Sequence, residues 1–472
     1  MAQAAVGAVG VPLADPYVLT KEGIKDPPRG WGESLRYLGP GLITSASIVG
    51  SGELIATTTM GAQAGFALLW MVIFSCGVKV AVQAEFARWT VATGTPALHG
   101  FNKVPPVFGR VGWVNLLWVV MILSKVLQVG GILGGTAVAF SILFPIGSDG
   151  LGQTSVTIWH VIVAIGSIVL LYSNAYGLIE KGAFYMVVTF SFITVCIAVG
   201  LPFTPWGYTP AELLSGLSFQ IPPGTLGAAI AVFGITGVGA DEITFYNYWC
   251  IEKGYARWVG PNDGSEAWKK RAKGWIDVMY KDIFVSFIIY TFATTAFFLM
   301  GAAVLYKQKL VPGGTNEMIT TLARMYTDTL GPWAMWGYLI GAIAVLGSTL
   351  WAAVPSQARM YVNFLATIGF LDWNNSKTRL TWLKVFTVAL PIIWACSSLF
   401  FKSPVLMVQI GGVMTGVFLL GVLAATWYLR TKETDKDLFG GLLFNLLLII
   451  SSIGIGLLGI YTVLQQFGFK IG

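Results

Sequence analysis

The sequence predicts an all-α polytopic membrane protein with about eleven transmembrane helices. Of its 472 residues, 55% are hydrophobic and only 11% are charged, and the mean hydropathy is +0.72. A soluble domain carries about 25% charged residues, so this chain lacks the polar surface of a water-soluble fold. The composition excludes a soluble enzyme, a disordered protein and a nucleic-acid-binding protein, although the isoelectric point is near 9.1.

Apolar segments long enough to cross a bilayer recur along the whole chain. A helix needs about 20 such residues to span roughly 30 Å of hydrocarbon. A polar tail, residues 1–37, comes first. The expected segments lie near residues 38–64, 66–88, 112–144, 155–175, 179–203, 224–251, 277–306, 330–352, 380–400, 404–427 and 438–465.

The positions of lysine and arginine predict the orientation of these segments. Twenty such residues lie in the tail and beside the connections that share its side, whereas only five lie on the opposite side. Those five are Lys307, Lys309, Arg324, Lys402 and Lys470. Because positive residues concentrate on the cytoplasmic side, we expect a cytoplasmic N-terminus and an external C-terminus, in the inner membrane of a bacterium.

Two segments, five apart, combine glycines with carboxylates at mid-membrane. The first contains Gly50-Ser51-Gly52-Glu53 and the sixth contains Gly237-Val238-Gly239-Ala240-Asp241-Glu242. Glycine in a helix interior costs about 1 kcal/mol relative to alanine, and a charge at the bilayer centre costs at least about 2.5 kcal/mol. Such stretches are tolerated where they line a buried cavity. Glycine-mediated helix packing is the alternative interpretation.

Matched breaks are typical of a 5+5 inverted-repeat transporter whose helices 1 and 6 are unwound at the midplane. We therefore expect the first repeat over residues 38–203 and the second over 204–427. Residues 428–472 would form the eleventh helix and the C-terminus.

Several stretches also carry a family resemblance. They are Leu38-Gly39-Pro40 through Val49, Gly61-Ala62-Gln63-Ala64-Gly65-Phe66, Thr90-Val91-Ala92-Thr93-Gly94, Leu213 through Leu217 and Gly347 through Gln357. From about residue 36 to residue 430 the chain resembles the Nramp family of divalent-metal transporters. The resemblance implies the same eleven-helix fold.

The metal-binding motifs of that family are altered here. Its Asp-Pro-Gly-Asn motif falls on Gly50-Ser51-Gly52-Glu53, so Gly50 replaces the metal-binding Asp and Glu53 replaces the Asn. Its metal-binding Met falls on Asp241, followed by Glu242, or on Gly239 if the register slips by two residues. A glutamine of its tenth segment falls on Thr415. Because carboxylates replace a thioether, we expect a hard cation with Glu53 and Asp241 as ligands.

The proton route that the resemblance implies is altered as well. An Asp and a Glu of the third segment fall on Lys125 and Gln128, and a histidine of the sixth falls on Ile243. Lys125 either pairs with a site carboxylate or extends toward the interface. We expect transport that is uncoupled, or coupled to protons only through the site carboxylates.

An Asp that the family keeps at the start of the seventh segment corresponds to Asp282. Its neighbour Lys281 suggests a structural ion pair as the alternative to a functional role for this carboxylate.

Three functional hypotheses follow. In the first, Glu53, Asp241 and Glu242 bind Mn²⁺ or Mg²⁺ in a secondary transporter that works by alternating access. In the second, Gly50-Ser51-Gly52, which also resembles the Gly-Ser-Gly of amino-acid permeases, holds an amino acid or a small organic cation. The third is a non-transporting sensor or scaffold. We expect no enzymatic activity, no cofactor and no nucleic acid; the partners would be the lipid bilayer and a small cationic substrate, bound by a monomer.

Overall fold

The computed structural model describes residues 15–50, 52–172 and 176–466, and long helices dominate these residues. In chain order the elements are η2 (Lys21–Gly23), α1 (Gly30–Ser34), η3 (Leu35–Tyr37), α2 (Pro40–Ile48), η4 (Gly52–Thr57), α3 (Thr58–Ala64), η5 (Gly65–Leu68), α4 (Leu69–Val78), α5 (Val80–Thr93), α6 (Ala97–Asn102), β1 (Val107–Phe108), β2 (Val111–Gly112), α7 (Trp113–Leu143), α8 (Gln153–Tyr172), α9 (Tyr176–Gly200), η6 (Leu201–Phe203), α10 (Pro210–Ser215), α11 (Leu226–Ile235), α12 (Ala240–Lys253), α13 (Tyr255–Val259), α14 (Glu266–Met300), η7 (Gly301–Leu305), α15 (Thr315–Leu330), α16 (Ala334–Thr367), α17 (Ser376–Phe400), α18 (Pro404–Lys432), η8 (Lys436–Leu438) and α19 (Leu442–Gln466). The two strands form a short antiparallel hairpin.

The predicted transmembrane segments are confirmed. Within the described residues, nine stretches are long and apolar enough to cross a membrane. The first of them, Pro40–Thr93, contains the first two expected segments. The fifth expected segment corresponds to α9. All eleven segments of the sequence prediction therefore have a helical counterpart.

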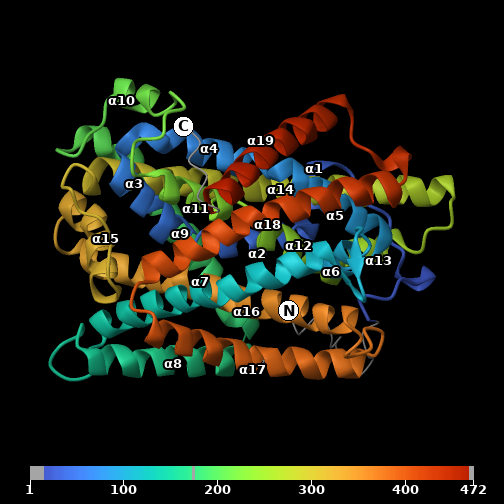
Figure 1. The fold of residues 1–472 in the computed structure, drawn as a ribbon, viewed down its shortest axis with the longest axis horizontal. Helices are drawn as coiled ribbons and strands as arrows, with labels where there is room; N and C mark the ends of the chain where they lie inside the picture. Colours follow the sequence, from blue (N-terminus) through green and yellow to red (C-terminus); the bar gives the residue numbers. More distant parts are fainter. Residues whose placement is uncertain (1–14, 51, 173–175, 467–472) are drawn as a thin grey trace.

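The long helices run roughly parallel to one another, along the horizontal of Figure 1. The short helices α10 and α15 lie at the left end of the bundle, whereas α6 and α13 lie toward the right end. The lysine and arginine pattern assigned the connections that contain α10 and α15 to one side of the membrane and those that contain α6 and α13 to the other. The two ends of the bundle agree with this assignment.

Helices 1 and 6 are both broken, as predicted. The first transmembrane helix consists of α2 and, after the break, the π-helical stretch η4 continued by α3. The sixth consists of α11 and α12, which are separated by Thr236–Gly239. The fold thus brings two interrupted helices into the core of the bundle.

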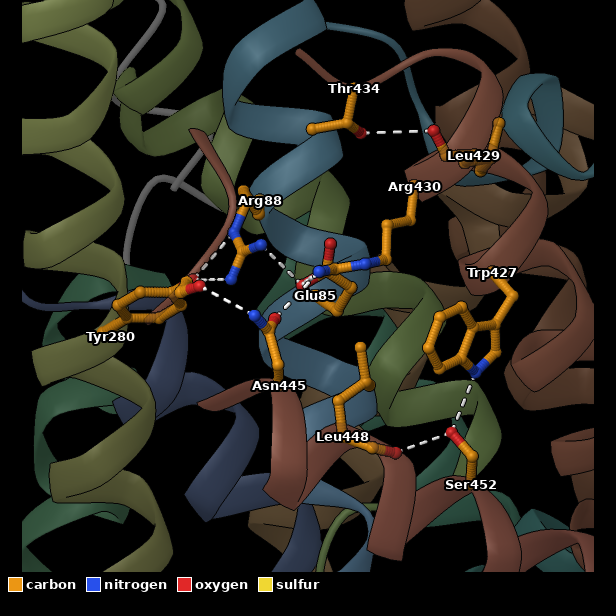
Figure 2. A network of polar contacts seen from close by, with 11 residues as sticks. Glu85, Arg88, Tyr280, Trp427, Leu429, Arg430, Thr434, Asn445, Leu448 and Ser452 are labelled. Atoms are coloured by element: carbon orange, nitrogen blue, oxygen red, sulfur yellow. Dashed lines mark hydrogen bonds and ion pairs between the residues drawn. The ribbon is translucent and has the colours of Figure 1, made fainter. Parts of the chain in front are cut away.

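A buried charge network joins four helices of the bundle (Figure 2). Glu85 Oε2 on α5 lies 2.7 Å from Arg88 Nη1 and 2.8 Å from Arg430 Nη1 of α18. Arg88 also donates to the hydroxyl of Tyr280 on α14, and Arg430 donates to Asn445 on α19. Glu85 therefore pairs helices within the bundle, and its carboxylate is buried.

Candidate functional site

The break in the first transmembrane helix lies where α16 passes closest to it. After α2 ends, the Gly50 amide donates to Ile48 O at 2.7 Å, which turns the chain out of the α-helix. A Cβ added at Gly50 would lie 1.6 Å from Thr349 Oγ1 of α16. Only glycine therefore fits at this point. The predicted site residue Ser51 lies outside the described residues, and Gly52 begins η4.

The break in the sixth helix depends on a second glycine. Gly237 has φ +65°, in the left-handed region that residues with a Cβ rarely adopt. The chain resumes its helix at Ala240, and Gly239 N donates to Glu242 Oε2 at 3.1 Å. Asp241 and Glu242 thus occupy the first turn of α12, where the positive end of the helix dipole stabilises carboxylates.

A small cavity lies between these two breaks. Its volume is about 30 Å³, which is room for about two water molecules. It is lined by residues of α2, α7, α12 and α16 together with the breaks: Ser47, Ile48, Gly52, Lys125, Gln128, Val129, Ile132, Ile235, Asp241, Glu242, Phe245, Thr349, Ala353 and Gln357.

An ion pair occupies one wall of this cavity. Lys125 Nζ lies 2.8 Å from Asp241 Oδ2, and the two side chains are only 2% and 6% exposed. Of the two roles open to Lys125 from the sequence, pairing with a site carboxylate is the one observed. The lysine therefore compensates the charge of Asp241 inside the bundle.

Two oxygens of cavity-lining residues have unused acceptor capacity. Gln128 Oε1 and Asp241 Oδ1 are buried; among the described residues the amide oxygen has no hydrogen-bond partner, and the Asp241 carboxylate contacts the Glu242 carboxyl besides its pair with Lys125. A buried acceptor without a partner loses about 1–3 kcal/mol of solvation. These oxygens are suited to receive a cation or a donor group that enters the cavity.

The third predicted carboxylate points elsewhere. Glu53 is fully buried on η4 and accepts a hydrogen bond of 2.9 Å from Thr294 of α14 and one of 3.4 Å from the Gly50 amide. It is not among the residues that line the cavity. Within the described part of the chain, no three His, Cys, Asp or Glu side chains come close enough together to hold a metal ion.

Two other predicted residues take part in helix contacts. Asp282 accepts from Gly39 N at 2.8 Å, from Gly41 N at 2.5 Å and from the Tyr246 hydroxyl at 2.8 Å, so it caps the start of α2. The suggested pair with Lys281 is wrong, because Lys281 binds Asp277 at 2.6 Å.

Thr415, which the resemblance placed in the site, is buried on α18. Its hydroxyl donates to Gly411 O at 2.7 Å within the same helix. The residue is not part of the cavity lining.

Sequence reasoning missed three polar residues of the cavity, Ser47, Thr349 and Gln357. Ser47 lies in the stretch of α2 and the other two in the stretch of α16 that carried part of the family resemblance, which is the only signal that could have found them.

A family model described as natural resistance-associated macrophage protein-like matches residues 41–465. The chain belongs to this Nramp family. Metal transporter Nramp3 of Arabidopsis thaliana is 27% identical over 211 residues, which are 44% of this chain and 38% of that protein. Natural resistance-associated macrophage protein 2 of Homo sapiens is 24% identical over 299 residues, which are 63% of this chain and 48% of that protein. The chain thus spans less than half the length of these Nramp relatives.

A solved structure supports the fold independently. The crystal structure of MhsT in complex with L-phenylalanine matches with a TM-score of 0.53 at 16% identity, over 90% of this chain and 97% of the MhsT chain. The Nramp chain is therefore an integral membrane protein with the inverted-repeat transporter fold.

Proposed function

We propose that this protein is a secondary transporter that carries a hard divalent cation, Mn²⁺ or Mg²⁺, across the membrane by alternating access. The observation that carries the proposal is the cavity between the two helix breaks. Gln128 brings a buried oxygen without a partner among the described residues to its lining, and Asp241 brings a carboxylate whose second oxygen, Oδ1, is not part of the ion pair with Lys125. Oxygen ligands of this kind suit Mg²⁺ and Mn²⁺.

The composition of the cavity favours a hard cation over a soft one. Its lining residues, as far as the structure describes them, include two carboxylates and two amides, but no Met, Cys or His. Soft transition metals prefer sulfur ligands, and imidazole suits zinc, copper and iron. We expect Cd²⁺ to bind less tightly than Mn²⁺ for this reason.

The cavity has a volume of about 30 Å³ in this conformation, which is room for about two waters and is compatible with a small ion. Transport of an amino acid or a small organic cation is the alternative that the experiment has to exclude.

We further infer that Asp241 and Glu242 bind the cation first, together with backbone carbonyls at the breaks. Glu53 would join them through a rearrangement of η4, since its carboxylate is bonded to Thr294 in this conformation. Alternating access follows from movement of one repeat against the other around this point. We further propose a monomer in the inner membrane of a bacterium, and the lysine and arginine pattern supports a cytoplasmic N-terminus.

The test is a flux measurement in proteoliposomes with Mn²⁺ and Mg²⁺ outside and a metal-sensitive dye inside. We expect saturable uptake by the wild type and a decrease of at least about tenfold for Asp241→Asn. Asp277→Asn, which changes a carboxylate that is 60% exposed, is the matched control and should transport normally.

Two other outcomes of the flux measurement would contradict the proposal. Uptake of an amino acid or an alkylamine without metal uptake would establish the organic-cation alternative. The absence of any uptake above empty liposomes, with correctly folded protein, would indicate a sensor or scaffold.

A further inference from the structure

A second lysine is buried at the broken sixth helix. Lys79 lies between α4 and α5, on the second transmembrane segment, and its exposed fraction is 0%. Burial excludes a position at the membrane interface, so the charge of Lys79 acts inside the bundle.

The side chain reaches the end of α11. Lys79 Nζ donates to Phe233 O at 2.7 Å and to Thr236 O at 2.5 Å. The hydroxyl of Ser75, one turn earlier, donates to the same two oxygens at 3.2 and 3.1 Å. The ammonium also lies 5.3 Å from the centre of the Phe233 ring, within the range of a cation–π contact.

These carbonyl oxygens are available because the helix is broken. The last carbonyls of a helix have no partner within it, and they form the negative end of the helix dipole. Since α11 ends at Ile235 and the chain turns at Gly237, the residues that follow do not continue the hydrogen-bond pattern of the helix. In transporters of this architecture, unwound carbonyls and half-helix C-termini coordinate a dissolved coupling cation.

We propose that the Lys79 ammonium is a built-in monovalent cation that occupies this carbonyl site. The broken helix is then held together without a dissolved ion, so neither its stability nor its position depends on Na⁺. Removal of the side chain creates an empty site of carbonyl and hydroxyl oxygens, which a small monovalent cation fills. This inference does not depend on the identity of the cargo.

The experiment compares the thermal stability of three variants and the wild type, each in 150 mM choline chloride, sodium chloride or methylammonium chloride. Lys79→Ala leaves both the oxygens and the space. Lys79→Leu leaves the oxygens but fills the space with an apolar group. Lys79→Arg keeps a positive charge at the site. Choline is the control for ionic strength, because its size excludes it from the vacated space.

We expect the melting temperature of Lys79→Ala to rise by about 2 to 5 °C in sodium or methylammonium relative to choline, by binding linkage. The wild type, Lys79→Arg and Lys79→Leu should change by less than about 1 °C. Equal melting temperatures of Lys79→Ala in all three salts would overturn the proposal, and so would an equal cation effect on the wild type.

A second measurement applies even if Lys79→Ala is too unstable for a melting curve. The yield of monodisperse Lys79→Ala after extraction should be at least about threefold higher in methylammonium or sodium than in choline. A yield that is equally low in every salt would show that the carbonyl site does not accept a dissolved cation. Because neither readout involves flux, a failure here is distinct from a failure of the transport proposal.

Discussion

Lys125 is the residue whose replacement should change cation binding most. A cation that binds Asp241 through Oδ1 has to compete with the charge of the lysine, because the ammonium lies 2.8 Å from Oδ2 of the same carboxylate. At this distance two unit charges attract by about 6 kcal/mol at an effective dielectric constant near 20. Breaking a buried pair by removing one partner costs about 3–5 kcal/mol in practice.

We therefore expect Lys125→Leu to bind Mn²⁺ at least about 100-fold more tightly than the wild type. The lower figure of about 3 kcal/mol corresponds to roughly two powers of ten in the dissociation constant. Without metal, the variant should be less stable, since Asp241 would keep an uncompensated charge beside Glu242. Mn²⁺ should restore this stability.

The assay is calorimetric titration of Mn²⁺ into the protein in lipid nanodiscs, followed by thermal unfolding with and without the metal. Lys103→Leu is the control, because Lys103 forms its ion pair with Glu433 at the surface, with side chains 41% and 33% exposed. Surface pairs of this kind contribute about 0–1 kcal/mol. If Lys125→Leu binds Mn²⁺ within twofold of the wild type, or more weakly, Lys125 does not compete with the cargo.

Four further outcomes are expected. Glu85→Gln leaves two buried arginines without their carboxylate, so the free energy of unfolding should fall by about 3–5 kcal/mol, measured by thermal unfolding in nanodiscs. Asp282→Ala leaves three donors without an acceptor and should cost about 3 kcal/mol in the same assay, whereas Asp277→Ala should change stability by less than about 1 kcal/mol. Gly50→Ala forces a Cβ onto α16 and should abolish metal flux, whereas Gly441→Ala, which has open space around it, should leave the flux unchanged. Finally, Mn²⁺ uptake by the wild type should proceed without proton influx, recorded with an internal pH dye, or with an influx that Glu53→Gln abolishes; a proton influx that survives Glu53→Gln would contradict this.

The helix breaks could be predicted from the sequence because their signals are local. Glycines beside carboxylates are unfavourable in a continuous transmembrane helix, whatever surrounds them. The positions of both breaks, at Gly50–Gly52 and near Gly237–Ala240, agree with the structure. The same holds for the eleven segments, since their hydrophobic length is a property of the chain alone.

The partners of the charged side chains could not be predicted in the same way. The sequence suggested Lys281 as the partner of Asp282. The amide that Asp282 binds most closely belongs instead to Gly41, 241 residues earlier in the chain. The hydrogen bond from Thr294 to Glu53, which lies on the π-helical stretch η4, could not be predicted from the sequence either. Contacts of this kind depend on the winding and packing of whole helices, on which the local sequence carries little information.

The two lysines give the broken sixth helix a consistent electrostatic design. At the break, α11 ends with a partial negative charge and α12 begins with a partial positive charge. Lys79 binds the carbonyls at the first of these ends, and Asp241 lies at the second, where Lys125 neutralises it. Each half of the helix thus has a compensating charge of the correct sign, and both lysines come from neighbouring helices. The break therefore persists without a bound ion, and a cation that enters the cavity competes with Lys125 while Lys79 still holds the end of α11.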